Sequence, residues 1–442
     1  FGGNSAKASS GINGVDRHAH AQPGSTNQDS VEAFLDDCIK GGGLSDNGIP
    51  GGNHLLPTLA NRSVDTLDWM RERAKVPLIL GGQLGGHSFA RTHRPTDGLA
   101  GSEIVVALEK QLKKYKESGQ LTVMKNTKAI SLTFGDDEIK GVYYEDTKTG
   151  HTGELSSPNV ILATGGYASD FTDDSLLNKY RPDLQRFATT NGKFSTGDGH
   201  KMAAVLGASM VDMEHVQVHP TGFIDPKDKS AAVKTLCDEI LRGVGGLLLP
   251  RDGNRFVDEL GTRDYVTARM LEEDPEDAEF LIVVSDAMAT EAEKHIGLYS
   301  SKGLLSHYDS LEEVATFPGL KNNVTASTLA TAILSYNQEA ISGLDNYGKT
   351  VFNHVPVSIT EGFWIGTVTP VIHYTMGGIQ IDSLGHVLRP DGSAIDGLFA
   401  AGEIVGGLHG KNRLGMTLQL CACFGVLLVL IILTFHGQVG TH

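Results

Sequence analysis

The sequence is poor in cysteine and has no excess of positive charge. Its 442 residues carry 37 Lys and Arg against 53 Asp and Glu, which gives a net charge of −16. Because binding to a phosphate backbone needs clustered Lys and Arg, we expect no nucleic-acid partner. The few cysteines are too scattered for a disulfide framework or a four-thiolate zinc site. They are Cys38, Cys237, Cys421 and Cys423.

Further absences concern ligands and targeting. The candidate histidines His219, His373 and His409 lie far apart in the sequence, so no metal site is predicted. The first 13 residues lack the basic start and apolar middle of a signal peptide. A G-x-G-x-x-G followed by an acidic residue, the usual mark of a dinucleotide-binding βαβ unit, is also absent.

One apolar run raises the question of a membrane. Residues 418–435 form an 18-residue stretch with one amide and one Thr, which meets the length of a membrane-span candidate. We favour an intracellular location, in the cytoplasm or an organelle matrix, and keep a membrane-attached tail as the minority interpretation. A reading frame shifted near the C-terminus would also produce such a tail.

Glycine, in contrast, is abundant and clustered. The chain has 54 Gly, and glycine-rich junctions follow apolar or strand-like runs at 163–169, 195–202 and 400–407. A single glycine pair is usually a turn. Three such junctions, whose backbone N–H groups can approach a ligand closely, favour a nucleotide cofactor instead.

Hydrophobic periodicity indicates a layered α/β fold. Helical patterns occupy 29–40, 63–75 and 102–118, and β-like patterns occupy 121–128, 129–134, 139–146 and 160–162. From about Glu214 longer helical stretches dominate, and the glycine-rich, β-like texture returns at 373–382. This interruption predicts a discontinuous α/β domain that contains a helical insert.

Charged and imidazole side chains recur in short motifs. They are His219 in HPTGF, Glu239 and Arg242 in EILRG, Arg263 in GTRD, His373 in HYTMGG and Arg413 in KNRLG. Taken singly, a lone His or a helical Glu–Arg pair is usually structural. If two His and several Arg converge in one cleft, they would bind a dicarboxylate, because a guanidinium matches a carboxylate through two parallel hydrogen bonds.

These motifs resemble the flavoprotein family of fumarate reductases and succinate dehydrogenases. The similarity is closest to the soluble, NADH-linked fumarate reductases of eukaryotic microbes and to the flavocytochrome c branch. It extends in family order from 2 to 415, through strings such as GGNSAKASSGIN, VILATGGYASD, EILRGVGGLLLPRDGNRFVDELGTRD and HYTMGGIQID. The resemblance implies a Rossmann-like FAD-binding domain in two parts, 1–213 and 375–442, interrupted by an α+β capping domain at 214–374.

The resemblance also implies a reaction. Fumarate would be reduced to succinate by a hydride from flavin N5 and a proton from Arg263, which Glu239 and Arg242 would resupply. The substrate carboxylates would be held by His219 on one side and by His373 and Arg413 on the other. The electrons would come from another domain or protein.

The same comparison of motifs assigns residues to FAD. They lie in the opening loop, after the strand at 160–162 and in two later glycine-rich junctions. They are Gly2, Gly3, Asn4, Ser5, Lys7, Ser9, Ser10, Gly11, Ile12, Asn13, Ala163, Gly165, Gly166, Asp198 and Glu403.

The chain departs from the family pattern at three places. The family's first strand, its G-x-G-x-x-G and its acidic ribose ligand would precede Phe1, so we expect this chain alone to bind FAD poorly or not at all. Met416 and Thr417 stand at or near a family Gly and Asn, where bulk would hinder approach to the flavin. Asp238 adds a carboxylate beside Glu239, which would repel a dianion unless it is protonated or turned away.

Two alternatives to fumarate reduction stay open. One is a related flavoprotein reductase or oxidase that acts on another unsaturated or amino acid, such as urocanate or L-aspartate. The other is a catalytically impaired fragment that keeps the fold and binds no flavin.

Overall fold

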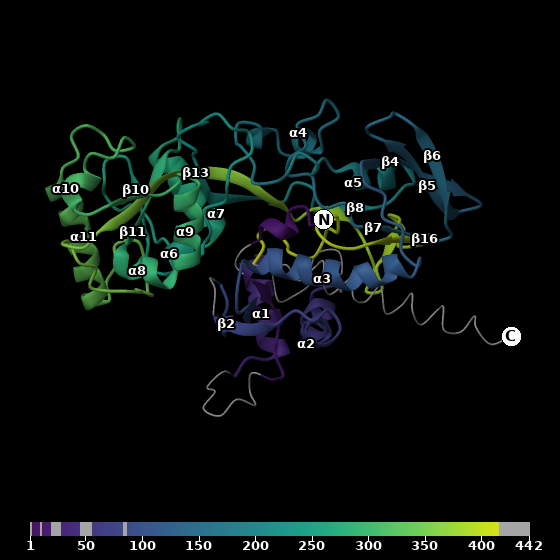
Figure 1. The fold of residues 1–442 in the computed structure, drawn as a ribbon, viewed down its shortest axis with the longest axis horizontal. Coiled ribbons are helices and arrows are strands. Elements are labelled where there is room, and N and C mark those ends of the chain that lie inside the picture. The colour runs from purple at the N-terminus through teal and green to yellow at the C-terminus, as the bar shows by residue number, and fades with distance from the viewer. Residues whose placement is uncertain (1, 9–10, 19–27, 45–54, 83–85, 415–442) are drawn as a thin grey trace. The chain divides into compact units, whose positions relative to one another are not determined.

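The computed structural model describes residues 2–8, 11–18, 28–44, 55–82 and 86–414. The chain divides into two compact units (Figure 1). Unit 1 comprises Phe1–Gln185, Gly192–Val216 and Tyr374–His442, and unit 2 comprises Arg186–Asn191 and Gln217–His373. The domain limits expected from the sequence, at 213/214 and 374/375, stay a prediction. The apolar run at 418–435 lies outside the described residues.

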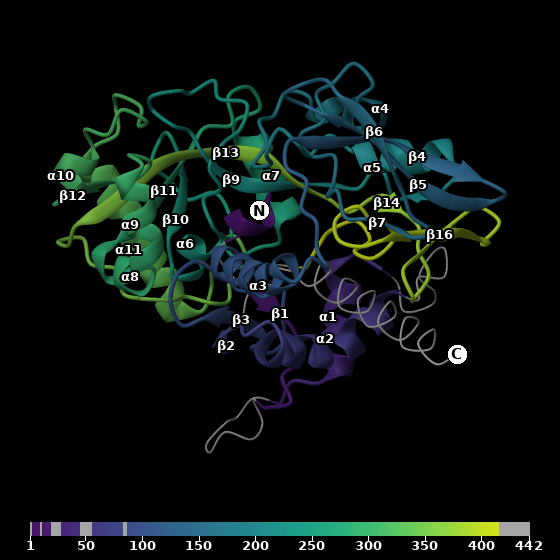
Figure 2. The ribbon, with the colours of Figure 1, turned by 45° about the vertical axis from the view of Figure 1, so that its right-hand side comes forward.

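Three helices of unit 1 come from the first 120 residues and gather with a small sheet (Figure 2). They are α1 (Val31–Gly41), α2 (Leu55–Glu72) and α3 (Ala100–Glu117). The Ser30 hydroxyl accepts the Ala33 N–H at 3.1 Å and so caps α1. The sheet has the order β1 (Ile12–Asn13), β3 (Thr92–Pro95), β2 (Leu78–Gly82).

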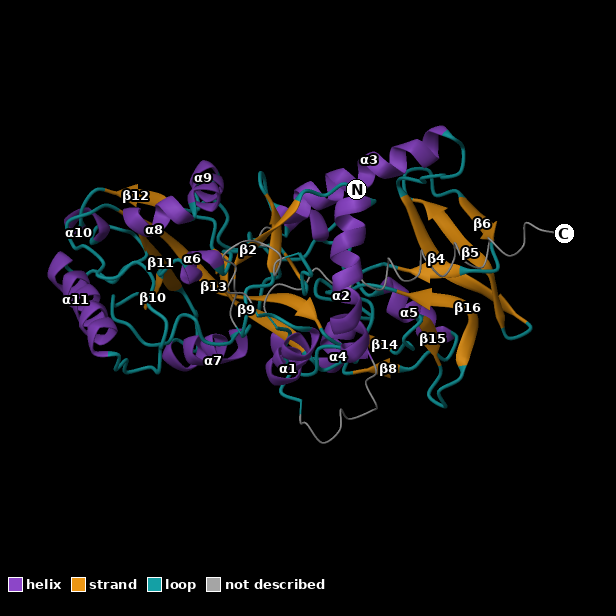
Figure 3. Ribbon diagram, turned by 90° about the horizontal axis from the view of Figure 1, so that it is seen from below, coloured by secondary structure: helices purple, strands orange, loops and turns teal. Residues whose placement is uncertain are grey.

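A six-stranded sheet forms the other main part of unit 1 (Figure 3). Its order is β15 (His386–Leu388), β16 (Ala394–Ala400), β5 (Glu138–Asp146), β4 (Thr127–Gly135), with β6 (Thr152–Ser156) on β5 and β7 (Val160–Leu162) on β16. The pairing of β7 with β16 is parallel, which brings the glycine junctions that follow both strands to the same sheet edge.

Unit 1 also contains several shorter helices and one short strand pair. They are the 3-10 helices η1 (Ser5–Lys7) and η3 (Pro182–Leu184), helices α4 (Leu176–Tyr180) and α5 (Asp198–Val205), and the antiparallel pair β8 (Met210–Val211) and β14 (Gly378–Ile379). The main apolar core of this unit includes Phe34, Leu56 and Leu398, each at most 1 % exposed.

Unit 2 is not the helical insert that the sequence texture predicted, because a five-stranded sheet forms its centre and helices flank it. The strand order is β10 (Leu247–Pro250), β11 (Phe280–Ser285), β13 (Phe363–Thr375), β12 (Ser306–Tyr308), with β9 (Val216–Phe223) also on β13. The helices are α6 (Ile240–Gly243), α7 (Arg263–Glu273), α8 (Asp286–Glu291), α9 (Glu293–Ser301), α10 (Leu311–Val314) and α11 (Ala326–Ser342). All six residues of β11 are buried, as expected for a strand covered on both faces.

The structure confirms the α/β class and corrects two local predictions. Residues 121–126 form no strand: β4 begins at Thr127, directly after Asn126, whose φ of 56° breaks an extended run. Helix α3 begins at Ala100 rather than Ser102, and its N-cap Leu99 makes no side-chain cap. Within the described residues, no helix is long and apolar enough to cross a bilayer.

Candidate active site

Arg263 is the centre of a buried polar cluster in unit 2. It is the first residue of α7 and is 5 % exposed. Its Nη1 donates to Gln217 Oε1 at 2.6 Å, while Nη2 and Nε donate to Glu239 Oε2 at 3.0 and 3.3 Å. The guanidinium is therefore held from two sides, by an amide on β9 and by the carboxylate at the N-cap of α6.

Arg242 lies in the same cluster. It is 1 % exposed, and its Nη1 donates to the Glu259 carbonyl oxygen. Among the described residues its Nε and Nη2 have no hydrogen-bond partner. Burial lowers the pKa of this guanidinium, an effect that the Glu239 carboxylate opposes and the Arg263 charge reinforces. The Glu239 carboxylate therefore interacts with both guanidinium groups, through hydrogen bonds with Arg263 and through its charge with Arg242.

His219 and His373 form an edge-to-face pair with ring centroids 5.3 Å apart. His219 is fully buried on β9, and burial, reinforced by the Arg263 charge, holds its pKa well below the usual value. Its Nδ1 lies 3.2 Å from the Thr221 nitrogen, and its Nε2 has no hydrogen-bond partner in the described part of the chain. A neutral imidazole with Nδ1 accepting has Nε2–H left to donate to a ligand.

The structure thus brings five of the six predicted catalytic and substrate residues together in unit 2. Gln217 belongs to the same cluster but was not predicted. Its position two residues before His219 on one strand places both on the same face, and that alternation was a usable signal.

Arg413, the sixth residue, lies in unit 1. Its guanidinium carbon is 4.1 Å from the centroid of the Tyr374 ring, a cation–π distance. His409 meets the same ring edge-on at 5.6 Å. Burial and then the Arg413 charge lower the pKa of His409 to about 3, so this imidazole is neutral at physiological pH.

The FAD residues predicted after β7 lie beside a buried carboxyl group. Glu403 Oε1 accepts the Thr375 N–H at 3.0 Å, and burial raises the Glu403 pKa. A Cβ at Gly166 would overlap the Thr375 hydroxyl and lie 2.6 Å from Glu403 Oε1, so only glycine fits. Gly165 has φ +80° and open space where a Cβ would stand, a surface that a flat ligand can approach closely.

Other predicted FAD residues lie in the opening loop. Gly2 and Gly3 have positive φ, Ser5 and Lys7 lie in η1, and Gly11 precedes Ile12 of β1. The Asn4 side chain donates to Ser195 Oγ at 2.8 Å and accepts the Gly192 N–H at 3.0 Å. Ala163 follows β7 directly, and Ser9 and Ser10 lie outside the described residues.

Two of these residues direct their side chains to other protein groups. Asn13 Oδ1 accepts the Thr92 hydroxyl at 2.7 Å, and its Nδ2 lies 3.1 Å from His87 Nε2. Asp198 forms an ion pair with Lys128 at 3.1 Å. Contacts from either residue to a cofactor would therefore compete with existing bonds or use the backbone.

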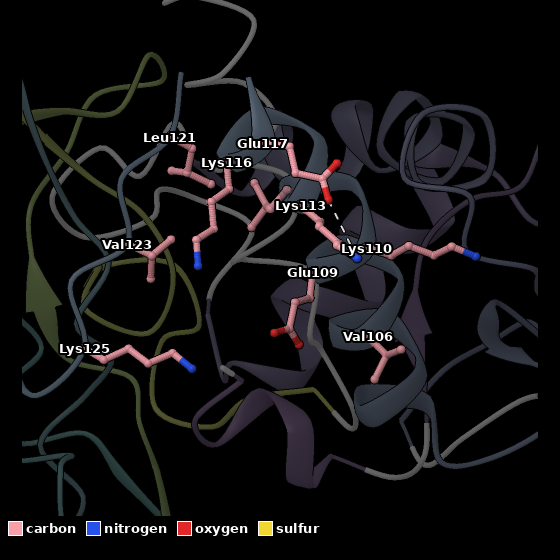
Figure 4. Close-up of a pocket in the computed structure, with 10 residues that line it drawn as sticks. Val106, Glu109, Lys110, Lys113, Lys116, Glu117, Leu121, Val123 and Lys125 are labelled. Atoms are coloured by element: carbon pink, nitrogen blue, oxygen red, sulfur yellow. Dashed lines mark ion pairs between the residues drawn. The ribbon is translucent and has the colours of Figure 1, made fainter. Parts of the chain in front are cut away.

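A separate cavity lies between α3 and the segment that follows it (Figure 4). It has a volume of about 1030 Å³ and is lined by α3 residues such as Val106 and Lys110 and by the segment 121–125. The ten lining residues drawn include none of the predicted site residues.

Comparison with known proteins identifies the class. The model of the FAD-binding domain family matches residues 1–417. A fumarate reductase of Schizosaccharomyces pombe is 42 % identical over 96 % of this chain and 81 % of its own length. Fumarate reductase 1 of Saccharomyces cerevisiae is 40 % identical over 96 % of this chain and 89 % of its own length. The open conformation of a flavocytochrome c3 fumarate reductase is 32 % identical, with a TM-score of 0.75, covering 96 % of this chain and 70 % of that one.

The class is therefore that of the FAD-dependent oxidoreductases. Within that class, the chain belongs to the FAD-binding domain family, among the fumarate reductase flavoproteins.

Proposed function

We propose that this protein reduces fumarate to succinate with FAD as its cofactor. Two yeast relatives at 40–42 % identity are named fumarate reductases, and the identity covers nearly the whole chain. The structural observation that supports the proposal most is the Arg263 guanidinium held between Gln217 and Glu239, with Arg242 buried in the same cluster.

Each of the six predicted catalytic and substrate residues has a role in this proposal. His219, His373 and Arg413 bind the two substrate carboxylates, since neutral N–H and guanidinium groups pair well with carboxylates. Arg263 delivers a proton to one alkene carbon. A free guanidinium is a weak acid, so proton donation requires developing negative charge beside it and a carboxylate that returns the proton. Glu239, in contact with Arg263, returns the proton to it, and Arg242 resupplies Glu239.

The residues around Gly166 fit the flavin end of FAD. The glycine backbone at Gly165 permits close approach, and the Glu403 carboxyl group, whose pKa is raised by burial, lies beside the loop. When bound, FAD supplies the hydride from its N5 atom. The electrons reach FAD from a donor domain or protein that the present chain does not identify.

The test is turnover with a panel of acceptors. The protein is purified, incubated with FAD, and assayed for oxidation of reduced methyl viologen with fumarate, urocanate or no acceptor. We expect the flavin-bound fraction of the protein to oxidise the dye with fumarate and not with urocanate. Equal rates with urocanate would overturn the fumarate assignment, and failure to retain any flavin absorbance would favour the impaired fragment.

A further inference from the structure

A buried contact joins α9 to the turn that precedes α6. The Tyr299 hydroxyl donates to Asp238 Oδ2 at 2.6 Å, and the Asp238 backbone N–H donates to the same hydroxyl oxygen at 3.2 Å. Tyr299 is 1 % exposed and Asp238 is 4 % exposed. One hydroxyl therefore fixes both the side chain and the backbone of Asp238, which turns its carboxylate towards α9.

The opposite side of this turn is held by β9. The Cys237 N–H donates to the Thr221 carbonyl oxygen at 3.0 Å, and the Thr221 hydroxyl donates to the Cys237 carbonyl oxygen at 2.9 Å. Residues 237 and 238 are thus clamped between a strand and a helix. The next residue is Glu239, so the clamp sets the point from which its side chain leaves the backbone.

Polar and charged groups face the Asp238 carboxylate from α9 and from its own segment. From α9 it faces Tyr299 and His295, whose Nε2 is 3.9 Å from Asp238 Oδ2. In its own segment, burial and then the Asp238 charge raise the pKa of the neighbouring Cys237 thiol, and the Arg242 charge opposes this rise. The Phe223 ring packs on Tyr299 at 4.7 Å and keeps the phenol in place.

We propose that Tyr299 and Asp238 are positioning residues that hold the Glu239 carboxylate against the Arg263 guanidinium. The inference rests on the function proposed above for Arg263 and Glu239. A carboxylate that must return protons to Arg263 needs a hydrogen-bond geometry like the 3.0 Å contact seen here. The reciprocal bonds between Tyr299 and Asp238 supply that rigidity, because they order the backbone one residue away.

The test compares three single variants of the full chain. Tyr299→Phe removes only the hydroxyl. Tyr336→Phe is the matched control, because Tyr336 is fully buried in the same unit and its hydroxyl has no hydrogen-bond partner among the described residues. Asp238→Asn keeps an oxygen that can accept from Tyr299 and removes only the charge.

We expect Tyr299→Phe to lower kcat for fumarate about tenfold, with KM changed less than about twofold, because substrate binding groups are untouched. Its pH profile of kcat should shift by about half a unit or more, since the proton-returning carboxylate has moved. Tyr336→Phe and Asp238→Asn should keep wild-type kcat and pH profile. A wild-type profile for Tyr299→Phe would overturn the proposal.

A crystal structure of Tyr299→Phe separates this proposal from the function it rests on. We expect the contact between Glu239 Oε2 and Arg263 Nη2 to lengthen beyond hydrogen-bonding distance, while it stays short in Tyr336→Phe. If the wild type reduces no fumarate, the proposed function fails and this distance still decides the positioning. If Asp238→Asn loses as much activity as Tyr299→Phe with the contact intact, the charge of Asp238 is responsible and positioning is refuted.

Discussion

At the residue scale, the proposed chemistry depends on how one guanidinium is held. The Arg263 guanidinium donates hydrogen bonds to Gln217 and Glu239, so its plane is fixed before a substrate binds. A fixed donor loses little entropy when the reaction begins, which is the main benefit of a preorganised acid.

Replacing Arg263 by Ala should abolish turnover and leave substrate binding largely in place. General acids contribute about 10²- to 10⁴-fold to rate, so kcat should fall in that range while the dissociation constant of succinate changes little. Stopped-flow kinetics and calorimetry measure the two quantities. Arg269→Ala on the same helix is the control, since among the described residues Arg269 donates to Glu272 and to the Phe256 carbonyl oxygen near the surface. Normal kcat with lost binding would refute the acid role.

Gly166→Ala should reduce the FAD content of the purified protein. The added methyl group would overlap the Thr375 hydroxyl and crowd Glu403, and such overpacking costs about 1–3 kcal/mol. The flavin absorbance per protein after reconstitution measures the effect. Gly297→Ala is the control, because open space surrounds that position on α9 and alanine favours a helix. Equal flavin content in both variants would count against the assignment of this loop to FAD.

Some residue roles were accessible from the sequence and others were not. The motifs around His219, Glu239 and Arg263 predicted polar groups that the fold does bring together. The hydrogen bond between Tyr299 and Asp238 joins residues 61 positions apart and depends on how α9 packs, so no local sequence pattern predicts it. The sequence only warned that a carboxylate beside Glu239 must be protonated or turned away, and the structure shows that it is turned away.

At the element scale, unit 2 contains a buried network that links three segments. Arg255 donates to both oxygens of Glu259 at 3.0 Å, and to Glu339 Oε2 and Asp345 Oδ1 at 2.6 Å. Lys349 Nζ donates to Glu259 Oε2 at 2.8 Å. The network ties α11 and the turn after it to the segment that leads into α7. It also fixes Glu259, whose carbonyl oxygen accepts a hydrogen bond from Arg242 Nη1.

Arg255→Leu should destabilise unit 2 by about 3–5 kcal/mol, because three carboxylates would lose their common cation in a buried site. Urea unfolding followed by tryptophan fluorescence in a Trp69→Phe background reports on this unit, since Trp364 lies on β13 and the other tryptophan, Trp69, lies on α2 of unit 1. In the control Arg251→Leu, a partly exposed ion pair with Glu279 at 3.5 Å and a hydrogen bond to the Gly319 carbonyl oxygen at 2.9 Å are lost, and the expected change is about 1–2 kcal/mol. Equal changes in the two variants would contradict a special role for the network.

The elements also show where periodicity succeeds as a predictor. Helix α1 was predicted because its apolar spacing ends against three glycines, and both signals are local. The run at 121–126 has β-like composition but no ladder partner in the described structure, and a left-handed Asn126 ends it. Strand formation depends on a neighbour that composition does not reveal.

For the whole molecule, buried neutral histidines predict sensitivity to acid. Burial lowers the pKa of His200 to about 4 and, with Arg413, that of His409 to about 3. In the unfolded chain these groups titrate near ~6.5, so between that pH and about 4 the unfolded state binds more protons. The free energy of unfolding should therefore fall as the pH decreases below 6.5, by up to about 1.4 kcal/mol per pH unit for each residue.

Chemical denaturation at a series of pH values measures this slope. His200→Met should make it shallower, because one proton-linked group is removed. His151→Gln should leave it unchanged, since His151 is exposed in the turn between β5 and β6. An identical slope in the wild type, His200→Met and His151→Gln would exclude His200 as a source of acid sensitivity.

The division of the chain into two units has a consequence for how such proteins diversify. Arg263, Glu239 and His219, assigned to protons and substrate, belong to unit 2, whereas the residues assigned to FAD belong to unit 1. Mutations that reshape the acid and the substrate residues of unit 2 therefore need not disturb the loops that hold the cofactor, whereas Arg413, the substrate residue of unit 1, shares its unit with those loops. Evolution can vary the acceptor molecule on one unit while it conserves the redox machinery on the other.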